Sequence, residues 1–465
     1  SVQRIARQDG IELLSADSLL PRVTVRIRDV GTLGRVRRLG FVDYLEPNAG
    51  GFQYLSGSSG CNYSFRSAPA QRTFAGDYMP PHYTRPVAQI NLAWNRTRGD
   101  GVILGLADTG ISEWQEDLIS LFAVGASAGR WYSYHGVQAR PWYATDCSHG
   151  TRMASAMAAG MNGVGTVGVA WRSHLVSAHQ DGKVFSVDTD DVVDGLRYAA
   201  GMNSAVSPRR VVAMAFQADN WYNSVSDEVR YWHYNGRLFV AAAGTVDYGG
   251  VAFPADMAEV VAVSAVGSNM EELSGLNYGS KVEVSFYEGQ LVNGKYTSDL
   301  VDLGGSSGAT AVVAGQAALI WAYYPAESNV QIRDRLRRAG HQYPNHDRVK
   351  GYGIVNVMRA VGGMYAVNIP PPRVVGGGGG TATVYEIEAL TVGGDGPFTY
   401  RWNTGETTRV IRYSMDAGDA PRTYTVTVSD ADPYGTTVQQ SSIPVTGPEW
   451  DCEQPTLPGM PPPVC

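Results

Sequence analysis

Three short stretches, widely separated along the chain, each contribute one residue type of a Ser-His-Asp triad. They are Asp108-Thr109-Gly110, Ser148-His149-Gly150-Thr151 and Gly305-Ser306-Ser307-Gly308. One triad geometry is assembled on several unrelated folds, and the order of the three residues along the chain differs from fold to fold. The order Asp, His, Ser therefore constrains the fold as well as the chemistry.

Length and composition narrow the class of protein. A chain of 465 residues is long enough for two or three domains, and 44% hydrophobic with 17% charged residues is typical of a globular protein. The net charge of −7 argues against nucleic acid as a partner and provides no basic patch for a membrane surface. No apolar run reaches membrane-spanning length, and no signal segment begins at Ser1, so we expect any export signal to be absent from this sequence.

The N-terminal residues predict a small unit over 1–48. Apolar and polar residues alternate over 21–27, which indicates a strand, and 41–47 reads as a second strand. Between them, Leu33, Val36 and Leu39 keep helical spacing. Residues 49–85 are rich in Gly, Ser and Pro and predict an irregular connector.

Residues 86–367 alternate short Val-, Ile- and Ala-rich runs with helical stretches. This alternation predicts an α/β domain in which helices cover both faces of a parallel sheet. Helices are expected after His149, around 187–200 and after Ser307. The expected strands are 102–107, 175–178, 211–216, 238–242 and 260–266.

Beyond residue 367 the pattern changes. Three prolines at 370–372 and five glycines at 376–380 predict a flexible linker over 368–380. In residues 381–446 apolar and polar residues alternate in short runs, which predicts the strands of a small β-sandwich, and 447–465 form a Pro-rich tail. The chain has four cysteines, which allow three disulfide connectivities, and free thiols are the alternative for Cys452 and Cys465. The other two are Cys61 and Cys147.

Several segments in register resemble the subtilisin-like serine proteases (subtilases). The matching segments are 102–118, 149–154, 167–170, 305–319 and 351–356. The resemblance implies a subtilisin-like α/β fold and a secreted endopeptidase that cleaves protein or peptide substrates through an acyl-enzyme. Residues 42–48, Val-Asp-Tyr-Leu-Glu-Pro-Asn, resemble the end of a subtilase propeptide, which implies an intramolecular propeptide. An accessory N-terminal cap is the alternative. Residues 381–446 resemble immunoglobulin-like modules that are appended to secreted hydrolases.

The resemblance also assigns roles to the triad residues. Ser307, at a helix N-terminus where the dipole favours negative charge, is expected to be the nucleophile. His149 would take the proton of Ser307 and return it to the leaving amine. Asp108 would hold the imidazole tautomer and stabilise its cation.

Three positions depart from the family pattern. Thr245 stands where the family has the asparagine of the oxyanion hole, and Gln217 stands where a glycine lets the substrate backbone approach. Gln115 stands where a histidine is common. The segments expected to line the substrate are Ala215, Phe216, Gln217, Ala242, Ala243 and Gly244. These departures leave an alternative open, in which an impaired protease fold serves as a binding or scaffolding protein.

The resemblance implies a structural calcium site as well. Its expected ligands are the side chains of Asp117 and Asn162 and the carbonyls of Gly160, Val164 and Thr166. Oxygen ligands from a tight loop suit Ca²⁺. A metal-free Asn-Gly turn is the alternative.

Overall fold

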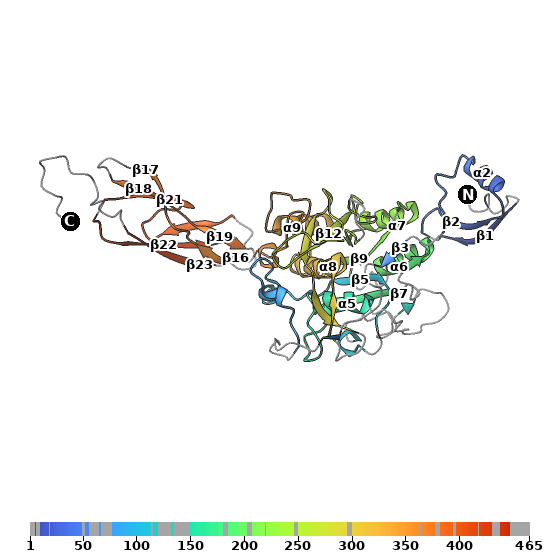
Figure 1. Ribbon diagram of the computed structural model, residues 1–465, viewed down its shortest axis with the longest axis horizontal. Helices are drawn as coiled ribbons and strands as arrows, with labels where there is room; N and C mark the ends of the chain where they lie inside the picture. The colour runs from blue at the N-terminus through green and yellow to red at the C-terminus, as the bar shows by residue number, and fades with distance from the viewer. Residues whose placement is uncertain are drawn as a thin grey trace, which may run out of the picture. The chain divides into compact units, whose positions relative to one another are not determined.

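A computed structural model gives the fold of the chain (Figure 1). It divides into two compact units, Ser1–Val357 and Met358–Cys465, which are described separately below. The structure describes residues 5, 10–17, 19–48, 52–54, 65–66, 77–112, 115–119, 132–133, 149–179, 185–201, 207–218, 220–245, 250–294, 300–362, 364–376, 382–393, 397–416, 418–429 and 438–446. All four cysteines, Ser148 and the tail 447–465 lie outside these residues.

A parallel sheet forms the centre of the first unit. Within the described residues, seven strands lie in the order β13-β12-β11-β9-β5-β7-β6 (Figure 1). Their bounds are β5 Ile103–Asp108, β6 Tyr132–Ser133, β7 His174–His179, β9 Arg210–Met214, β11 Arg237–Ala242, β12 Val260–Val266 and β13 Val284–Tyr287. β5, β9, β11 and β12 are buried along their whole length, as expected for runs that are apolar on both faces. The predicted parallel sheet is confirmed.

Helices cover both faces of this sheet. α6 (Thr189–Gly201) and α7 (Asn223–Tyr234) share an apolar cluster with every second residue of the strands, such as Val212, Met214 and Phe239. The alternate strand residues point to the opposite face. There α5 (His149–Ala158) and α8 (Gly305–Tyr323) pack against each other and against the strands. The other helices within the described residues of this unit are α2 Val30–Arg37, η1 Pro81–Thr84, α3 Ile90–Ala93, α4 Glu116–Ile119, α9 Asn329–Ala339 and α10 Val357–Ala360, the last of which continues into the second unit.

The strand expected at 211–216 is divided in two. β9 ends at Met214, Ala215 has no strand pairing, and β10 (Phe216–Ala218) belongs to a different sheet. The chain therefore leaves the parallel sheet at Ala215. This break matters for function because 215–217 is a segment expected to line the substrate.

The N-terminal residues differ from the prediction. β2 (Val23–Ile27) pairs with β1 (Ile11–Ala16), and the strand expected at 41–47 is wrong. Its polar groups instead bond to the N-terminal ends of α6 and α7, so the segment has no strand partner.

The connector 49–85 also holds regular structure, contrary to the prediction. β3 (Phe52–Tyr54) lies between β10 and β8 (Phe185–Val187) and is antiparallel to both. β4 (Phe65–Arg66) pairs with β15 (Leu300–Leu303), which also pairs with β14 (Gln290–Asn293). The pairings of β3 and β4 join residues that are more than a hundred positions apart, and local composition does not reveal them.

The second unit is built from antiparallel strands around one apolar core. β17, β18 and β21 form one sheet, β20, β22 and β23 another, and β16 pairs with β19. Their bounds are β16 Met364–Asn368, β17 Arg373–Gly376, β18 Thr383–Glu388, β19 Leu390–Gly393, β20 Thr399–Trp402, β21 Val410–Met415, β22 Arg422–Ser429 and β23 Val438–Val445. The core includes Ile387, Trp402 and Val426.

Two details of the predicted organisation around residue 367 change. Residues 364–367 fall within the predicted bounds of the catalytic domain, but they form most of β16, which pairs with β19, and the second compact unit begins at Met358. β17 occupies part of the expected linker because its residues pair with β18. Over the described residues, no helix is both long enough and apolar enough to cross a bilayer.

Candidate active site

The parallel sheet brings three of the predicted segments to one edge. β5 lies between β7 and β9. After β5 the chain forms β6 and β7 on one side of it and then β9, β11, β12 and β13 on the other, which makes this the switch point of the sheet. Ligands of open α/β sheets bind beside the carboxyl ends of strands at such a point. Asp108 ends β5, Ala215 follows β9, and Gly244 follows β11.

Asp108 and His149 form a buried pair at this edge. The Nδ1 atom of His149 lies 2.8 Å from Oδ1 and 3.0 Å from Oδ2 of Asp108, and both side chains are fully buried. The backbone N–H of Thr109 also donates to Asp108 over 2.7 Å. A carboxylate on Nδ1 favours the tautomer with its proton on Nδ1, which leaves Nε2 as an acceptor.

Neighbouring residues hold the two segments together. The backbone N–H of Gly150 donates to Thr109 Oγ1 over 3.0 Å, and the N–H of Ser112 donates to Thr151 Oγ1 over 2.8 Å. Gly150 packs so closely that a Cβ atom there would overlap the carbonyl of Gly110. The Asp-Thr-Gly and His-Gly-Thr motifs therefore also have a structural role. The threonine of each motif accepts a hydrogen bond from a backbone N–H of the other segment, and the glycines let the two segments approach closely.

The third motif opens α8, and it separates the two adjacent serines. Ser306 Oγ donates to the carbonyl of Gly244 over 3.2 Å and lies 3.3 Å from its N–H. Ser307 is the third residue of the helix and is fully buried. Gly308 lies against the carbonyl of Leu303, 2.6 Å from where its Cβ would be, which lets the helix start directly after β15. Ser306 thus joins α8 to the loop after β11.

Gln217 reaches from one expected substrate-lining segment to the other. Its Oε1 accepts a hydrogen bond of 3.1 Å from the backbone N–H of Thr245, and the side chain is buried. An atom at the Cβ position of Gly244 would lie 2.7 Å from the same Oε1. The structure therefore places Gln217 beside Gly244 and Thr245, in the segment that follows Ala242 and Ala243.

Some of the residues of the expected calcium site lie close to one another. Asp117, fully buried on α4, accepts from Asn162 Nδ2 over 3.0 Å and from Asn293 Nδ2 over 2.5 Å. Burial raises the pKa of Asp117 and the neighbouring carboxylate of Asp77 adds to this, so that its pKa is about 7 despite hydrogen bonds that lower it. Gly160 lies against Asn162, and Thr166 Oγ1 donates to the carbonyl of Tyr78 over 2.8 Å.

Asp77 and Asn293 were not predicted from the sequence. Asp77 Oδ1 accepts from the N–H groups of Asn162, Gly163 and Val164 over 3.2, 2.9 and 3.1 Å. Asn293 Oδ1 is buried and has no hydrogen-bond partner in the described part of the chain. Asp77 lies in the connector and Asn293 ends β14, so no local motif links them to the loop 160–166.

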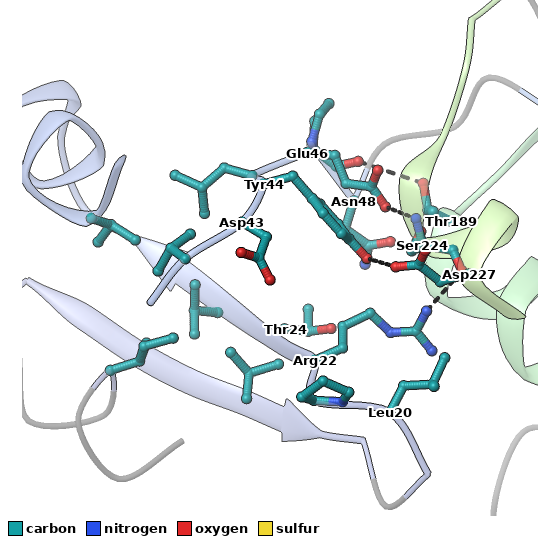
Figure 2. Close-up of a pocket in the computed structure, with 18 of the residues that line it drawn as sticks. Leu20, Arg22, Thr24, Asp43, Tyr44, Glu46, Asn48, Thr189, Ser224 and Asp227 are labelled. Carbon is teal, nitrogen blue, oxygen red and sulfur yellow. Dashed lines mark hydrogen bonds between the residues drawn. The ribbon is translucent and has the colours of Figure 1, made fainter. Parts of the chain in front are cut away.

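A second contact region joins the N-terminal residues to α6 and α7 (Figure 2). The Glu46 carboxylate accepts from the N–H groups of Asn223 and Ser224 over 2.8 and 3.0 Å. Tyr44 donates to Asp227 over 2.8 Å, and the N–H of Asp190 donates to Asn48 over 3.0 Å. Acidic and amide oxygens satisfy N–H groups that a helix leaves unpaired at its first turn.

An ion-pair cluster extends this contact. Asp17 accepts from Arg22 and, over 2.6 Å, from Arg197, which also bonds to Glu228 over 2.6 Å. A cavity of about 750 Å³ separates β2 and α2 from α7, and Arg22 and Tyr44 cross it (Figure 2). These contacts between the N-terminal residues and the helices α6 and α7 are thus polar and lie around a cavity.

Comparisons with known proteins identify the family of the chain. The model of the subtilase family (Peptidase_S8) matches residues 99–353. The thermostable alkaline protease of Halalkalibacterium halodurans is 32% identical over 263 residues, which are 56% of this chain and 68% of that protein. The halolysin-like extracellular serine protease of Natrialba magadii is 26% identical over 325 residues, 69% of this chain and 55% of that protein. A solved protease structure from Pseudoalteromonas arctica PAMC 21717 aligns with a TM-score of 0.51 and 26% identity, over 60% of this chain and 95% of that one.

The family model covers more than half of the chain, and the fold and the order of the three motifs agree with it. The chain belongs to the subtilase family. It is a subtilisin-like serine protease.

Proposed function

We propose that the chain cleaves peptide bonds with Asp108, His149 and Ser307 as its triad. His149 Nε2 takes the proton from Ser307 Oγ as the oxygen attacks the scissile carbonyl carbon. The tetrahedral intermediate collapses, the C–N bond breaks, and His149 returns the proton to the leaving amine. Water, deprotonated by the same imidazole, then releases the acid and restores the serine.

The buried hydrogen bond between His149 Nδ1 and the Asp108 carboxylate supports this proposal most strongly. An imidazolium that forms during the reaction needs a counter-charge, and a carboxylate at 2.8 Å provides it. The start of α8 supplies the second requirement, since the dipole at the N-terminus of this helix favours a developing oxyanion at Ser307.

A pair of serine variants tests the assignment. Ser307→Ala is expected to abolish peptide hydrolysis with an unchanged fold, because it removes the attacking oxygen. Ser306→Ala is the matched control, and we expect it to keep activity while losing about 1 kcal/mol of stability with its contact to Gly244. Loss of hydrolysis in Ser306→Ala and full activity in Ser307→Ala would reassign the nucleophile.

The oxyanion hole of this proposal differs from that of the family. The backbone N–H of Ser307 is one donor, and the hydroxyl of Thr245 replaces the longer arm of an asparagine. Because that hydroxyl is on a shorter side chain, we expect a slow enzyme. If the altered oxyanion hole abolished catalysis altogether, the protein would be an impaired protease fold that only binds peptides.

The N-terminal residues 1–48 are proposed to act as an intramolecular propeptide. The caps that Glu46 and Asn48 provide to α7 and α6 support this role, since both are contacts between the unit and the protease domain. β3 supports it further, because its backbone pairs along β10, where a substrate is expected to add a strand. The chain would then cover its own substrate-binding strand until it is cut.

A structural calcium ion is also proposed. Two buried carboxylates, Asp77 and Asp117, lie beside two side-chain amides, Asn162 and Asn293, and the unpartnered Oδ1 of Asn293 is an available oxygen. A Cβ atom on Gly165 would overlap that oxygen, so the loop leaves the space open. These hard oxygen donors fit Ca²⁺. The expected ligands remain Asp117, Asn162 and the carbonyls of Gly160, Val164 and Thr166, and the ion would neutralise the two acids and fix the loop.

Secretion is proposed from the relatives. The Natrialba protease is described as extracellular, and it shares the longest matched stretch among the comparisons above. A four-cysteine chain with an antiparallel C-terminal unit, which we propose to be an immunoglobulin-like module, is compatible with such an environment.

A further inference from the structure

The side chain of Gln217 crosses the place where a substrate side chain is expected. Phe216 belongs to the apolar cluster beneath α6 and α7, so the next side chain along β10 projects from the other face. There Oε1 of Gln217 bonds to the N–H of Thr245 over 3.1 Å. The amide therefore bridges the segment 215–217 and the loop after β11.

Two buried side-chain amides at this place have polar atoms without a hydrogen-bond partner in the described part of the chain. Gln217 Nε2 and both Oδ1 and Nδ2 of Asn277 have none within the described residues, although the two residues are 1% and 2% exposed. The N–H of Asn277 donates to the carbonyl of Gly244 over 3.0 Å, and its Nδ2 would overlap a Cβ atom on Gly244. Both amide groups therefore lie against the Cα of Gly244.

Unpaired buried polar groups cost free energy, and a native structure that keeps several in one place calls for an explanation. Gln217 Nε2 can donate, and the Asn277 amide can donate and accept. A ligand group that both accepts and donates would satisfy these atoms at once.

The direction of a bound peptide brings its reacting end to this place. β3 runs antiparallel along β10, with Tyr54 opposite Phe216, so a chain laid on β10 in this direction continues toward Ala215. Ala215 is level with Asp108 when the register between β5 and β9 is extended by two residues. The residue on the acyl side of the scissile bond (P1) is thus expected beside Gln217 and Gly244.

We propose that Gln217 and Asn277 form a P1 subsite that selects asparagine, whose short side-chain carboxamide pairs with their unpartnered amides. This inference rests on the proposed function. Gln217 shortens the subsite, because a long or aromatic P1 side chain must displace its bridge to Thr245. The amides set the chemistry, because an apolar side chain of the same size leaves them unpaired.

Leucine is the matched competitor of asparagine, since the two side chains have nearly the same shape and differ in polarity. We expect wild-type protein to cleave a P1 Asn peptide with a kcat/KM at least about tenfold above that of the P1 Leu peptide in the same frame. A P1 Phe peptide is expected to be poorer than both. Gln217→Gly should open the subsite and make Phe the best of the three.

Gln217→Met separates length from hydrogen bonding, because methionine keeps the length and has no amide. It should still discriminate against Phe and should lose the preference for Asn over Leu. Fluorophosphonate titration of Ser307 in each variant, with its melting temperature, normalises the rates to folded and reactive protein.

A wild-type preference for Leu or Phe over Asn would overturn the inference, and so would an unchanged Asn preference in Gln217→Met. Either result with normal Ser307-dependent hydrolysis leaves the proposed function intact. Absence of any Ser307-dependent hydrolysis would instead contradict the proposed function itself.

Discussion

Thr245 is the residue at which this chain departs most directly from the chemistry of its family. Its backbone N–H donates to Gln217 Oε1. In the proposed mechanism its hydroxyl takes the place of the asparagine side chain that donates to the oxyanion in the family. A donor that acts in the transition state changes kcat more than KM.

We predict that Thr245→Asn raises kcat with little change in KM. Loss of one oxyanion donor costs on the order of 10²–10³ in kcat, so a well-placed amide could restore up to that factor. Steady-state kinetics on one peptide check the change, and Gln217→Gly is the background that removes crowding. A lower kcat for Thr245→Asn in both backgrounds would mean that Thr245 is already a competent donor or is needed for the fold.

At the scale of single residues, the sequence predicts which residues form the site better than it predicts which residues contact one another. The Asp108–His149 hydrogen bond follows from two motifs that both appear in the sequence, and the structure shows it. Asp77 and Asn277 carry no such motif, because their roles arise from the residues that folding brings beside them. The bridge from Gln217 to Thr245 was likewise invisible, although crowding by Gln217 was expected.

At the scale of elements, the apolar strands were predictable and the polar attachments were not. Buried strands such as β11 and β12 are apolar runs, so their position follows from composition. The segment 41–47 has a similar pattern and was misread, since its partners are helix ends and not a strand. β3 is recognisable only from its pairing with β8 and β10.

The loop 160–166 leads to a prediction about calcium. Adding a chelator should lower the unfolding temperature, because an ion bound by the native state stabilises it by about 2.7 kcal/mol when its concentration is about 100 times Kd. Asp117→Asn is the control and should respond little to chelator. Identical calorimetric curves for wild-type protein with and without chelator would remove calcium from the account.

The ion pair between Asp17 and Arg197 of α6 should weaken in strong acid. Burial tends to raise the pKa of Asp17, but hydrogen bonds from Arg197, Leu20 and Leu19 outweigh it and lower the pKa from 3.8 to about 2. A lowered pKa means that the carboxylate stabilises the fold above about pH 4 and loses this effect as the pH falls toward 2.

Calorimetry of Ser307→Ala protein, with and without the additional change Asp17→Asn, tests this dependence. The difference in unfolding temperature should be constant from pH 6 to about pH 4 and should vanish near pH 2. A difference that disappears already between pH 6 and pH 5 would contradict the assignment of Asp17.

At the scale of the whole molecule, the propeptide-like residues bear on where the chain is cut during maturation. The sequence predicts that the N-terminal unit ends at residue 48. In the structure the contact with the protease domain extends further, because β3 pairs with β10 as far as Tyr54. Local pattern could not show this, because the partner strands lie more than 130 residues further along the chain.

We predict that the mature N-terminus lies beyond residue 54. A strand that pairs along β10 directs the chain after it toward the triad, where it can be cut. Intact mass spectrometry of active protein measures the boundary, and Ser307→Ala protein should remain uncut. An active form that begins between residues 1 and 54, and so keeps β3 attached, would contradict the prediction.

The central claim is that Ser307, activated by the His149–Asp108 pair, is the nucleophile. A fluorophosphonate probe forms a covalent bond only with an activated serine, so labelling followed by peptide mapping tests the claim without choosing a substrate. We predict one adduct, on Ser307, in wild-type and Ser306→Ala protein, and none in folded Ser307→Ala or His149→Ala protein. Labelling of Ser306, or no labelling of folded wild-type protein, would contradict the account.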